Sequence, residues 1–169
     1  MSEKRSIGIT SIEIGPIGAT GAMGTTLAVL GKTYKDSAEL MQDDPTLTDI
    51  ESEEDDDPIE TIMQKGKTTL KFSIMDYTPE TLVKVLGGTV TGTAPNTVWE
   101  APATAEDIQR SVKVTTKTGI VMSIVRAQII AKLNAKLSKT GVALVDIQCR
   151  VMTPTLADTA PLTITPPAA

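Results

Sequence analysis

The chain of 169 residues contains no histidine and a single cysteine, Cys149. The side chain most often used for proton transfer near neutral pH, which is also a frequent metal ligand, is therefore missing. This excludes Ser-His-Asp triads and metal centres built on clusters of Cys and His. One cysteine cannot form an internal disulfide, and the neighbours of Cys149 predict a small buried hydrophobe rather than a reactive thiol.

Aromatic residues make up only 2% of the chain, and no apolar run approaches the length of a membrane span. Scarce rings and a net charge of −5 disfavour nucleic-acid binding. The opening residues MSEKRSIGIT lack the hydrophobic middle of a signal peptide. We expect a soluble protein without a membrane segment, made in a cytoplasm, with a core of Val, Ile, Leu, Ala and Met.

Basic residues are absent from residues 36–60, a window that holds 12 of the 21 acids. The window carries a formal charge of −12, and the rest of the chain carries +7. Such separation within one small domain is a stronger clue to binding partners than the net charge. Residues 36–58 are expected to form a loop or hairpin, with the acidic loop itself at about residues 43–58.

Alternating apolar and polar residues predict several strands. We expect strands over residues 6–14, with a bulge near Ser11, over residues 25–34, and over residues 67–76. Two shorter strands are expected at TVTGT and TVWE. Since no repeated alternation of strands and helices is visible, the chain is expected to be mainly β.

One helix is expected, at about residues 79–87. Thr78 is suited to the N-cap, Pro79 to the first helical position, and two glycines end the helix. Its expected buried stripe consists of Leu82, Val83 and Leu86. The fold class that follows is a β-sandwich or barrel with one flanking α-helix and long β-hairpins.

The most informative pattern covers residues 126–152. Every odd position from Ala127 to Leu137 is apolar, and the even positions are polar except for Ile130. A helix is the alternative interpretation, but a period of two residues accounts for all six apolar positions, which a helical stripe does not. Residues 143–151 alternate in the same way after the turn SKTG. We therefore predict a long β-hairpin with one dry face and one polar face.

The stretch GPIGATGAMGTT, residues 15–26, resembles the glycine-rich turn of short-chain dehydrogenases. Such a turn requires strands and helices that alternate after it, and those enzymes also carry a Tyr-x-x-x-Lys pair. Tyr34 is followed four residues later by Ala38, and Tyr77 by Thr81, so the pair is missing. A bend between two strands is the favoured interpretation, and no cofactor is expected.

The acidic window also matches the spacing of an EF-hand calcium loop. Its acids at the ligand positions are Asp49, Glu51, Glu53, Asp55, Asp57 and Glu60. The sixth position of such a loop requires glycine, and Glu54 stands there. A solvated or interface loop is the favoured interpretation, with weak binding of divalent cations left open. No residues stand out as catalytic or as metal ligands, and we expect a protein that is not an enzyme.

The order of these elements resembles the tail tube proteins of tailed bacteriophages. The likeness covers roughly residues 6–154: a glycine-containing first strand region, a long acidic loop, the strand TTLKFSIMD, the helix TPETLVKVLGGTV, and two long strands that end in VMTP. It implies one β domain, residues 1–155, followed by a Pro-rich extended C-terminal arm, residues 156–169. It further implies hexameric rings that stack into a hollow tube for DNA, in a virion tail assembled in the host bacterial cytoplasm.

Two groups of residues acquire expected roles from this resemblance. The polar face of the hairpin is expected to line the channel, through Arg126, Gln128, Lys132, Asn134, Lys136, Asp146, Gln148 and Arg150. The acidic loop is expected to contact the next ring, through Asp49, Glu51, Glu53, Glu54, Asp55, Asp56 and Asp57. Two alternatives stay open for this loop: its carboxylates face the channel, or Lys32, Lys35, Lys65 and Lys67 neutralise them within one subunit.

The resemblance implies further partners. Other copies of the chain come first, then the tape measure, tail tip and tail terminator proteins, with DNA as passing cargo. The alternative function is that of another virion component, a capsid decoration or tail-completion protein, which forms closed oligomers. A nucleotide-binding enzyme that uses Gly15–Gly24 is the third and least favoured hypothesis.

Overall fold

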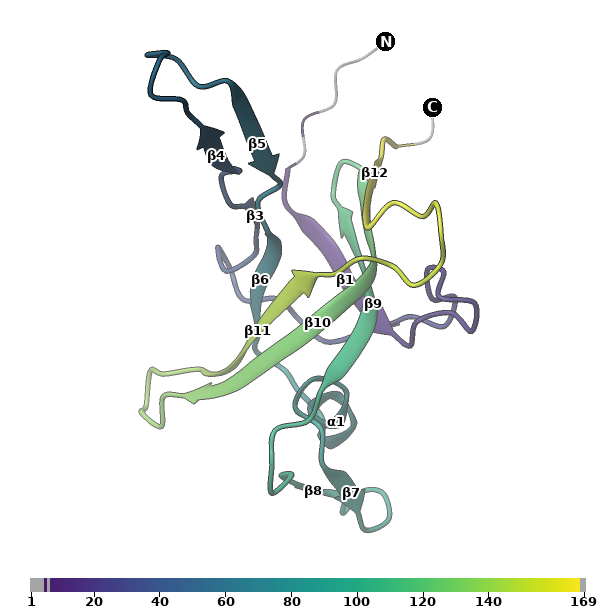
Figure 1. The fold of residues 1–169 in the computed structure, drawn as a ribbon. Helices are drawn as coiled ribbons and strands as arrows, with labels where there is room; N and C mark the ends of the chain where they lie inside the picture. Colours follow the sequence, from purple (N-terminus) through teal and green to yellow (C-terminus); the bar gives the residue numbers. More distant parts are fainter. Residues whose placement is uncertain (1–4, 6, 168–169) are drawn as a thin grey trace.

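The computed structural model describes Arg5 and residues 7–167 (Figure 1). In this part the chain is mainly β, with antiparallel sheets and one helix, which confirms the expected fold class. Ser6, in the first expected strand, lies outside the described residues. The same holds for residues 1–4 of the expected domain and residues 168–169 of the expected arm.

The strands are numbered in chain order. The first six are β1 (Ile9–Gly15), β2 (Ala28–Val29), β3 (Glu39–Gln42), β4 (Thr46–Ile50), β5 (Glu60–Gln64) and β6 (Thr68–Ile74). The helix α1 (Pro79–Leu86) follows. The remaining strands are β7 (Thr89–Thr91), β8 (Val98–Glu100), β9 (Ile108–Thr116), β10 (Val121–Ala135), β11 (Ala143–Val151) and β12 (Leu162–Thr165).

The main sheet has the strand order β2-β1-β9-β10-β11-β6-β3. The segment from β2 to Tyr34 closes this sheet into a barrel, because it bonds to β1 near one end of the order and to β6 near the other. At one end β2 pairs with β1, and the Leu30 amide donates to the Ile12 carbonyl. At the other end Tyr34 N donates to the Ser73 carbonyl at 2.8 Å. The barrel strands therefore leave little open edge around the core.

The core fills the interior of this barrel with aliphatic side chains. Phe72 is its one aromatic member that is fully buried, which agrees with the scarcity of rings in the sequence. Each central strand contributes alternate residues. They include Ile12 and Ile14 of β1, Leu70 and Ile74 of β6, Val112 and Val114 of β9, Ala127 and Ile129 of β10, and Val145, Ile147 and Cys149 of β11.

A bulge in β10 changes which side chains point inward. Ile124 lies opposite Val112, whereas Ala127 lies opposite Arg110, so β10 holds one extra residue there. Both Ile124 and Val125 are buried as a result. A second register shift, in β1 between Ile9 and Ser11, confirms the bulge expected near Ser11.

The expected strand over residues 25–34 is much shorter in the structure. Only Ala28 and Val29 form β2, and Thr33 makes an isolated bridge to Ile74. Gly31 interrupts the strand with a φ of +152°. A Cβ at this position would lie 2.3 Å from the Asp76 carbonyl oxygen, so the chain passes too close to Asp76 for any other residue.

The helix forms where expected, with Thr78 as N-cap: its side chain accepts a hydrogen bond from Thr81 N. The expected buried stripe is partly wrong. The buried residues are Thr81, Leu82 and Val85, while Val83 and Leu86 are half-buried. The Thr81 hydroxyl donates to the Leu30 carbonyl at 3.3 Å, which turns this side of the helix toward the barrel. No helix in the described residues is long and apolar enough to cross a membrane.

The two closing strands form the predicted long hairpin, and the C-terminal segment returns to it. β10 pairs with β11 from Ala127 to Ala135 and with β12 from Val121 to Ile124. Since β9 occupies the other edge of β10, β11 and β12 share one edge, one after the other. The extended arm expected at residues 156–169 is thus attached to the sheet through β12.

We predict that Phe72→Ala lowers the free energy of unfolding by about 3–5 kcal/mol, because it leaves a cavity in the barrel where the largest fully buried side chain now lies. Urea unfolding followed by circular dichroism measures this change. Ile130→Ala, at a position 48% exposed on the outside of β10, is the control and should change stability by no more than about 0.5 kcal/mol. Equal effects of both substitutions would contradict the assigned core.

Candidate functional site

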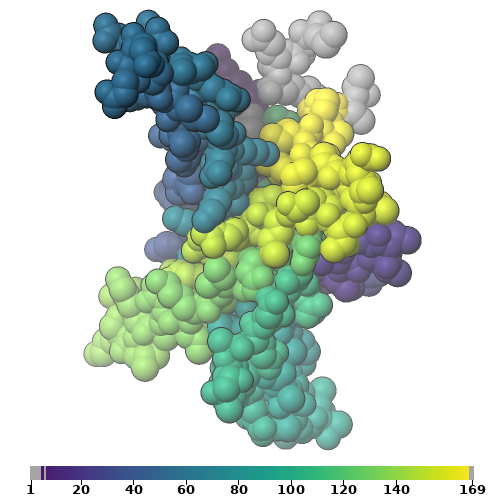
Figure 2. Space-filling model, in the orientation of Figure 1, coloured from purple at the N-terminus to yellow at the C-terminus, as the bar shows by residue number. Residues whose placement is uncertain are grey.

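Two hairpins extend away from the barrel and form its most prominent surfaces (Figures 1 and 2). We call β4–β5 with its connecting loop, residues 46–64, the acidic hairpin. We call the far end of β10–β11, residues 130–144, the basic tip. In the view of Figure 1 the acidic hairpin projects at the upper left and the basic tip at the lower left, and each lies beyond the strands that enclose the core.

The acidic hairpin has no buried side, since every residue of β4 and β5 is exposed. It carries eight carboxylates and no base. Of the residues expected at an interface, Asp49 lies in β4 and Glu51, Glu53, Glu54, Asp55, Asp56 and Asp57 lie in the connecting loop. The structure therefore gathers all seven on one projection, as part of a hairpin longer than the acidic loop expected at residues 43–58.

The contacts within the acidic hairpin are local. Thr61 donates to Asp49 at 2.7 Å across the two strands, and the Ser52 hydroxyl accepts from the amides of Glu54 and Asp55. In the described residues, no three His, Cys, Asp or Glu side chains are placed to hold a metal ion. The EF-hand interpretation thus gains no support from the geometry.

The acidic hairpin also exposes large apolar side chains that the sequence analysis did not single out. They are Leu47, Ile50, Ile59, Ile62 and Met63, with exposed fractions between 45% and 68%. They occur on both faces of the hairpin, so they do not alternate regularly along either strand. An available signal was the number of Ile, Leu and Met residues in a segment otherwise so rich in charge.

The lysines that flank the acidic window do not neutralise it by ion pairing. In the described part of the chain, the one ion pair joins Lys113 Nζ to Glu13 at 3.7 Å. It involves none of Lys32, Lys35, Lys65 and Lys67. The alternative in which these lysines neutralise the acidic loop within one subunit therefore finds no contact in the structure.

Seven of the eight polar residues expected on the hairpin share one side of the sheet. They are Arg126, Gln128, Lys132 and Asn134 of β10 and Asp146, Gln148 and Arg150 of β11, which alternate with the residues of the apolar side. Lys136 lies beyond the end of β10. Neighbouring strands extend this polar face. Lys71 and Ser73 of β6 lie opposite Gln148 and Asp146, and Gln109 of β9 lies opposite Gln128.

Asp146 is the centre of a small hydrogen-bond network on the polar face. Its carboxylate accepts from the Ser73 hydroxyl at 2.6 Å and from the Asn134 amide at 3.0 Å. The hydrogen bond from Ser73, with those from Asn134 and the charge of Lys132, holds the pKa of Asp146 below its ordinary value despite partial burial. This network ties β10, β11 and β6 together at the point where the hairpin leaves the barrel.

Arg126 is fixed at the other end of the polar face. Its Nε donates to Gln109 Oε1 at 2.9 Å, and its Nη1 donates to the Thr153 carbonyl at 3.2 Å. Arg126 thus links β9 and β10 to the chain that leaves β11. Because the guanidinium is held by these two bonds, it has a structural role as well as its place on the polar face.

The apolar face of the hairpin, predicted to be buried, is buried along only half of its length. Ile129 is buried, but Leu133 is 49% exposed and Leu137 is 94% exposed. The reason is that β9 pairs with β10 only as far as Ile129, and β6 pairs with β11 only from Val145 onward. Beyond these positions the hairpin extends past the barrel, and the chain covers only about half of Leu133 and almost none of Leu137.

The basic tip also has an open strand edge. In the described residues, positions 130–135 of β10 pair with β11 on one edge and with no strand on the other. Between Ala127 and Val145 the sequence holds Lys132, Lys136 and Lys139 and no acid. An open edge, exposed apolar side chains and charge of one sign are therefore combined at this tip.

The glycine-rich stretch forms a bend between β1 and β2. Its amides are bonded within the protein: Gly18 N donates to Ala22 O, Gly21 N to Gly18 O, and Gly24 N to Ser111 Oγ at 3.0 Å. Ser111 in turn donates to the Val125 carbonyl at the bulge of β10. No helix follows the glycines before β2, so the described geometry lacks the helix start that a dinucleotide-binding turn requires.

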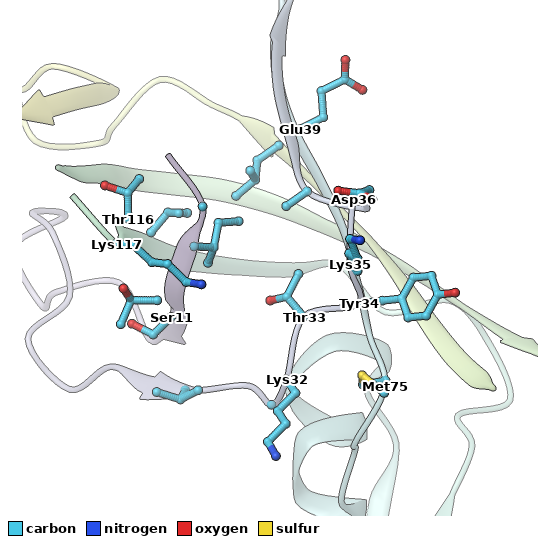
Figure 3. Close-up of a pocket in the computed structure, with 18 of the residues that line it drawn as sticks. Ser11, Lys32, Thr33, Tyr34, Lys35, Asp36, Glu39, Met75, Thr116 and Lys117 are labelled. Atoms are coloured by element: carbon cyan, nitrogen blue, oxygen red, sulfur yellow. The ribbon is translucent and has the colours of Figure 1, made fainter. Parts of the chain in front are cut away.

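One mouth of the barrel forms a cavity of about 1020 Å³ (Figure 3). Lys117 and Ser11 lie on one wall, and Thr33 and Lys35 lie on the other. Charges of both signs line it, namely Lys32, Lys35, Lys117, Asp36, Glu39 and Asp76. Since these formal charges cancel, the cavity has no evident preference for an anion or a cation. Sequence reasoning did not identify it, because its walls come from segments far apart in the chain.

Cys149 is fully buried in β11, as the sequence analysis expected. Burial raises the pKa of its thiol to about 12, so the thiolate is not formed at neutral pH. Cys149 is therefore part of the core and has no access to a substrate.

No protein-family model matches the chain, and a search of curated proteins finds no match.

We predict that Asp146→Asn destabilises the protein at neutral pH and that the difference from the wild type shrinks in acid. A carboxyl whose pKa is lower in the folded than in the unfolded state stabilises the fold above the unfolded value, about 4, and this contribution is lost as the pH falls through the folded value. The midpoints of urea unfolding of the wild type and the variant, taken between about pH 7 and pH 2, measure this difference in stability. Asp56→Asn controls for the substitution, and a difference independent of pH would contradict the assigned network.

Proposed function

We propose that the chain is a structural subunit of a bacteriophage tail tube, which assembles into hexameric rings that stack into a hollow tube. One observation carries the proposal. The β10–β11 hairpin extends past its own barrel with an open strand edge and with Leu133 and Leu137 exposed. Exposed edges and apolar tips of this kind are aggregation hazards unless another chain covers them.

A ring of identical subunits provides such a cover. If the open edge of β10 pairs with a strand of the neighbouring subunit, the hairpins of a ring join into one continuous sheet. The apolar side of each hairpin is then covered by the neighbouring subunits, and the polar side faces the channel. The expected lumen residues that lie in the two strands, which are all of them except Lys136, are on that polar side.

The proposal extends to partners by the same family resemblance. A stacked tube has two ends and an interior, and the tail terminator, tail tip and tape measure proteins are the partners proposed for them. Duplex DNA is passing cargo, and the proposed location is the virion tail. We propose no catalytic step, since the described geometry offers the glycine bend no helix start and the thiol of Cys149 no access.

A capsid decoration or tail-completion protein is the competing proposal. Such a protein forms closed oligomers, in which every surface of one type is satisfied within the particle. The two hairpins favour the tube instead, because they are different surfaces that lie far apart on the subunit, at the upper left and the lower left of Figure 1, and a contact between two different surfaces leaves one of them free at each end of a stack. Free surfaces at both ends permit open stacking.

Electron microscopy of the purified, concentrated protein tests the proposal. We predict tubes with a regular axial repeat. Compact closed particles would contradict the tube and support the decoration or completion protein, and a monomer at all concentrations would contradict both.

A pair of matched variants shows whether the hairpin is responsible. Leu137→Asp should prevent assembly without loss of folding, because Leu137 is 94% exposed and packs against nothing in its own chain. Val98→Asp makes the same chemical change at a position 58% exposed in β8 and should leave the tubes intact. Tubes formed by Leu137→Asp would contradict the role assigned to the hairpin.

A further inference from the structure

We infer that the acidic hairpin of one subunit docks on the basic tip of a subunit in the adjacent ring. This inference rests on the proposed function and specifies it, since it names both halves of the contact between rings. Pairing within a ring uses the open edge of β10, and the end of the tip around Leu137 is the part assigned to the contact between rings, where the proposed occupant is residues 46–64 of a second copy of the same chain.

The charges of the two surfaces are complementary. The acidic hairpin carries eight carboxylates without a base, and the basic tip carries Lys132, Lys136 and Lys139 without an acid. All three lysines are exposed. Neither surface makes an ion pair within the described part of its own chain, but Lys132 lies opposite Asp146 across β10 and β11. The carboxylates of the acidic hairpin and the charges of Lys136 and Lys139 are therefore available to a partner. Opposite charges of this density steer association and fix its register.

Both surfaces also expose apolar side chains next to their charges. On the tip these are Leu133, Leu137 and Val142, and on the acidic hairpin they are Leu47, Ile50, Ile59, Ile62 and Met63. A hairpin exposed on both faces has little stability of its own. Burial of its apolar side chains against a second surface stabilises it. The apolar side chains thus give the contact its stability, and the charges give it its direction.

The positions of the two surfaces make the contact head-to-tail. They are two different surfaces, which lie at the upper left and the lower left of the subunit in Figures 1 and 2, so the contact joins one surface of a copy to the other surface of the next copy. A heterologous contact of this kind generates an open stack rather than a closed pair. It also places carboxylates beside Lys132 and Lys136 of the proposed lumen face, where free lysines would bind the phosphates of passing DNA.

Charge reversal tests this pairing. The tip variant carries Lys132→Glu, Lys136→Glu and Lys139→Glu. The hairpin variant replaces the acids at positions 53–57 with lysine, as E53K, E54K, D55K, D56K and D57K. Alone, each variant should form rings that do not stack, because its two surfaces then have the same sign. We expect the fraction of protein that sediments as tubes to fall by about tenfold or more.

Mixing the two variants should restore tubes of alternating rings. The unchanged acidic hairpin of the tip variant meets an unchanged basic tip, and the two reversed surfaces meet each other. The control variant carries Lys32→Glu, Lys35→Glu and Lys117→Glu, at three exposed positions around the mouth of the barrel (Figure 3). It makes the same change in charge as the tip variant and should stack like the wild type.

Several outcomes would overturn the pairing. Tubes formed by the tip variant alone, or a mixture that fails to stack although circular dichroism shows both variants folded, would do so. Should either reversed variant not fold, neutral replacements by Gln and Asn at the same positions take its place and should weaken stacking. Normal stacking of the tip variant with lost affinity for duplex DNA would overturn the pairing and assign the lysines to phosphates.

The pairing and the tube can fail separately. If the wild type forms tubes and both variants do as well, the pairing is wrong and the tube stands. If the wild type forms only closed particles, the tube is wrong. Analytical ultracentrifugation of the mixed variants still tests the pairing in that case: association of the two variants with each other and not with themselves supports it, and its absence overturns it.

Discussion

The structure depends on a mismatch in length between β10 and the strands beside it. β10 runs from Val121 to Ala135, but β9 pairs with it only as far as Ile129. Up to that residue the sheet closes into a barrel and buries its apolar face. Beyond it the same alternation of residues continues without a core to cover it. The chain therefore encodes more apolar sheet than one subunit can bury, and this excess is the physical basis of the proposed assembly.

The acidic hairpin also has apolar side chains that its own chain does not cover. Its strands are exposed on both faces, and its charge is of one sign. Exposed ion pairs each contribute at most about 1 kcal/mol, so charge alone does not make a stable contact. Apolar burial contributes about 25 cal/mol per Å², and a ring repeats every contact around its circumference, which multiplies weak contacts into a strong one. In the proposed assembly the apolar residues supply the stability and the charges select the partner surface.

The sequence predicted those elements whose residues alternate cleanly. The hairpin from Arg126 to Met152 and the helix with its Thr78 cap follow from local patterns, and so does the shared polar face. The length of the barrel around the hairpin did not follow, because it depends on where β9 and β6 stop pairing. The exposure of Leu137 could not be predicted from the local pattern, because it depends on where these two neighbouring strands end. The return of β12 and the hairpin register of residues 46–64 also depend on partners distant in sequence or on irregular patterns.

Hydrogen exchange of the backbone amides tests the central claim most directly. It compares the dilute monomer with the concentrated protein, residue by residue, and needs no substitution. The account predicts rapid exchange in the monomer at residues 46–64 and 130–142, with marked slowing in both segments on assembly. The amides of β9, in the barrel, should be protected in both states. Slow exchange of the two hairpins in the monomer, or no slowing on assembly, would contradict the claim that other copies complete this fold.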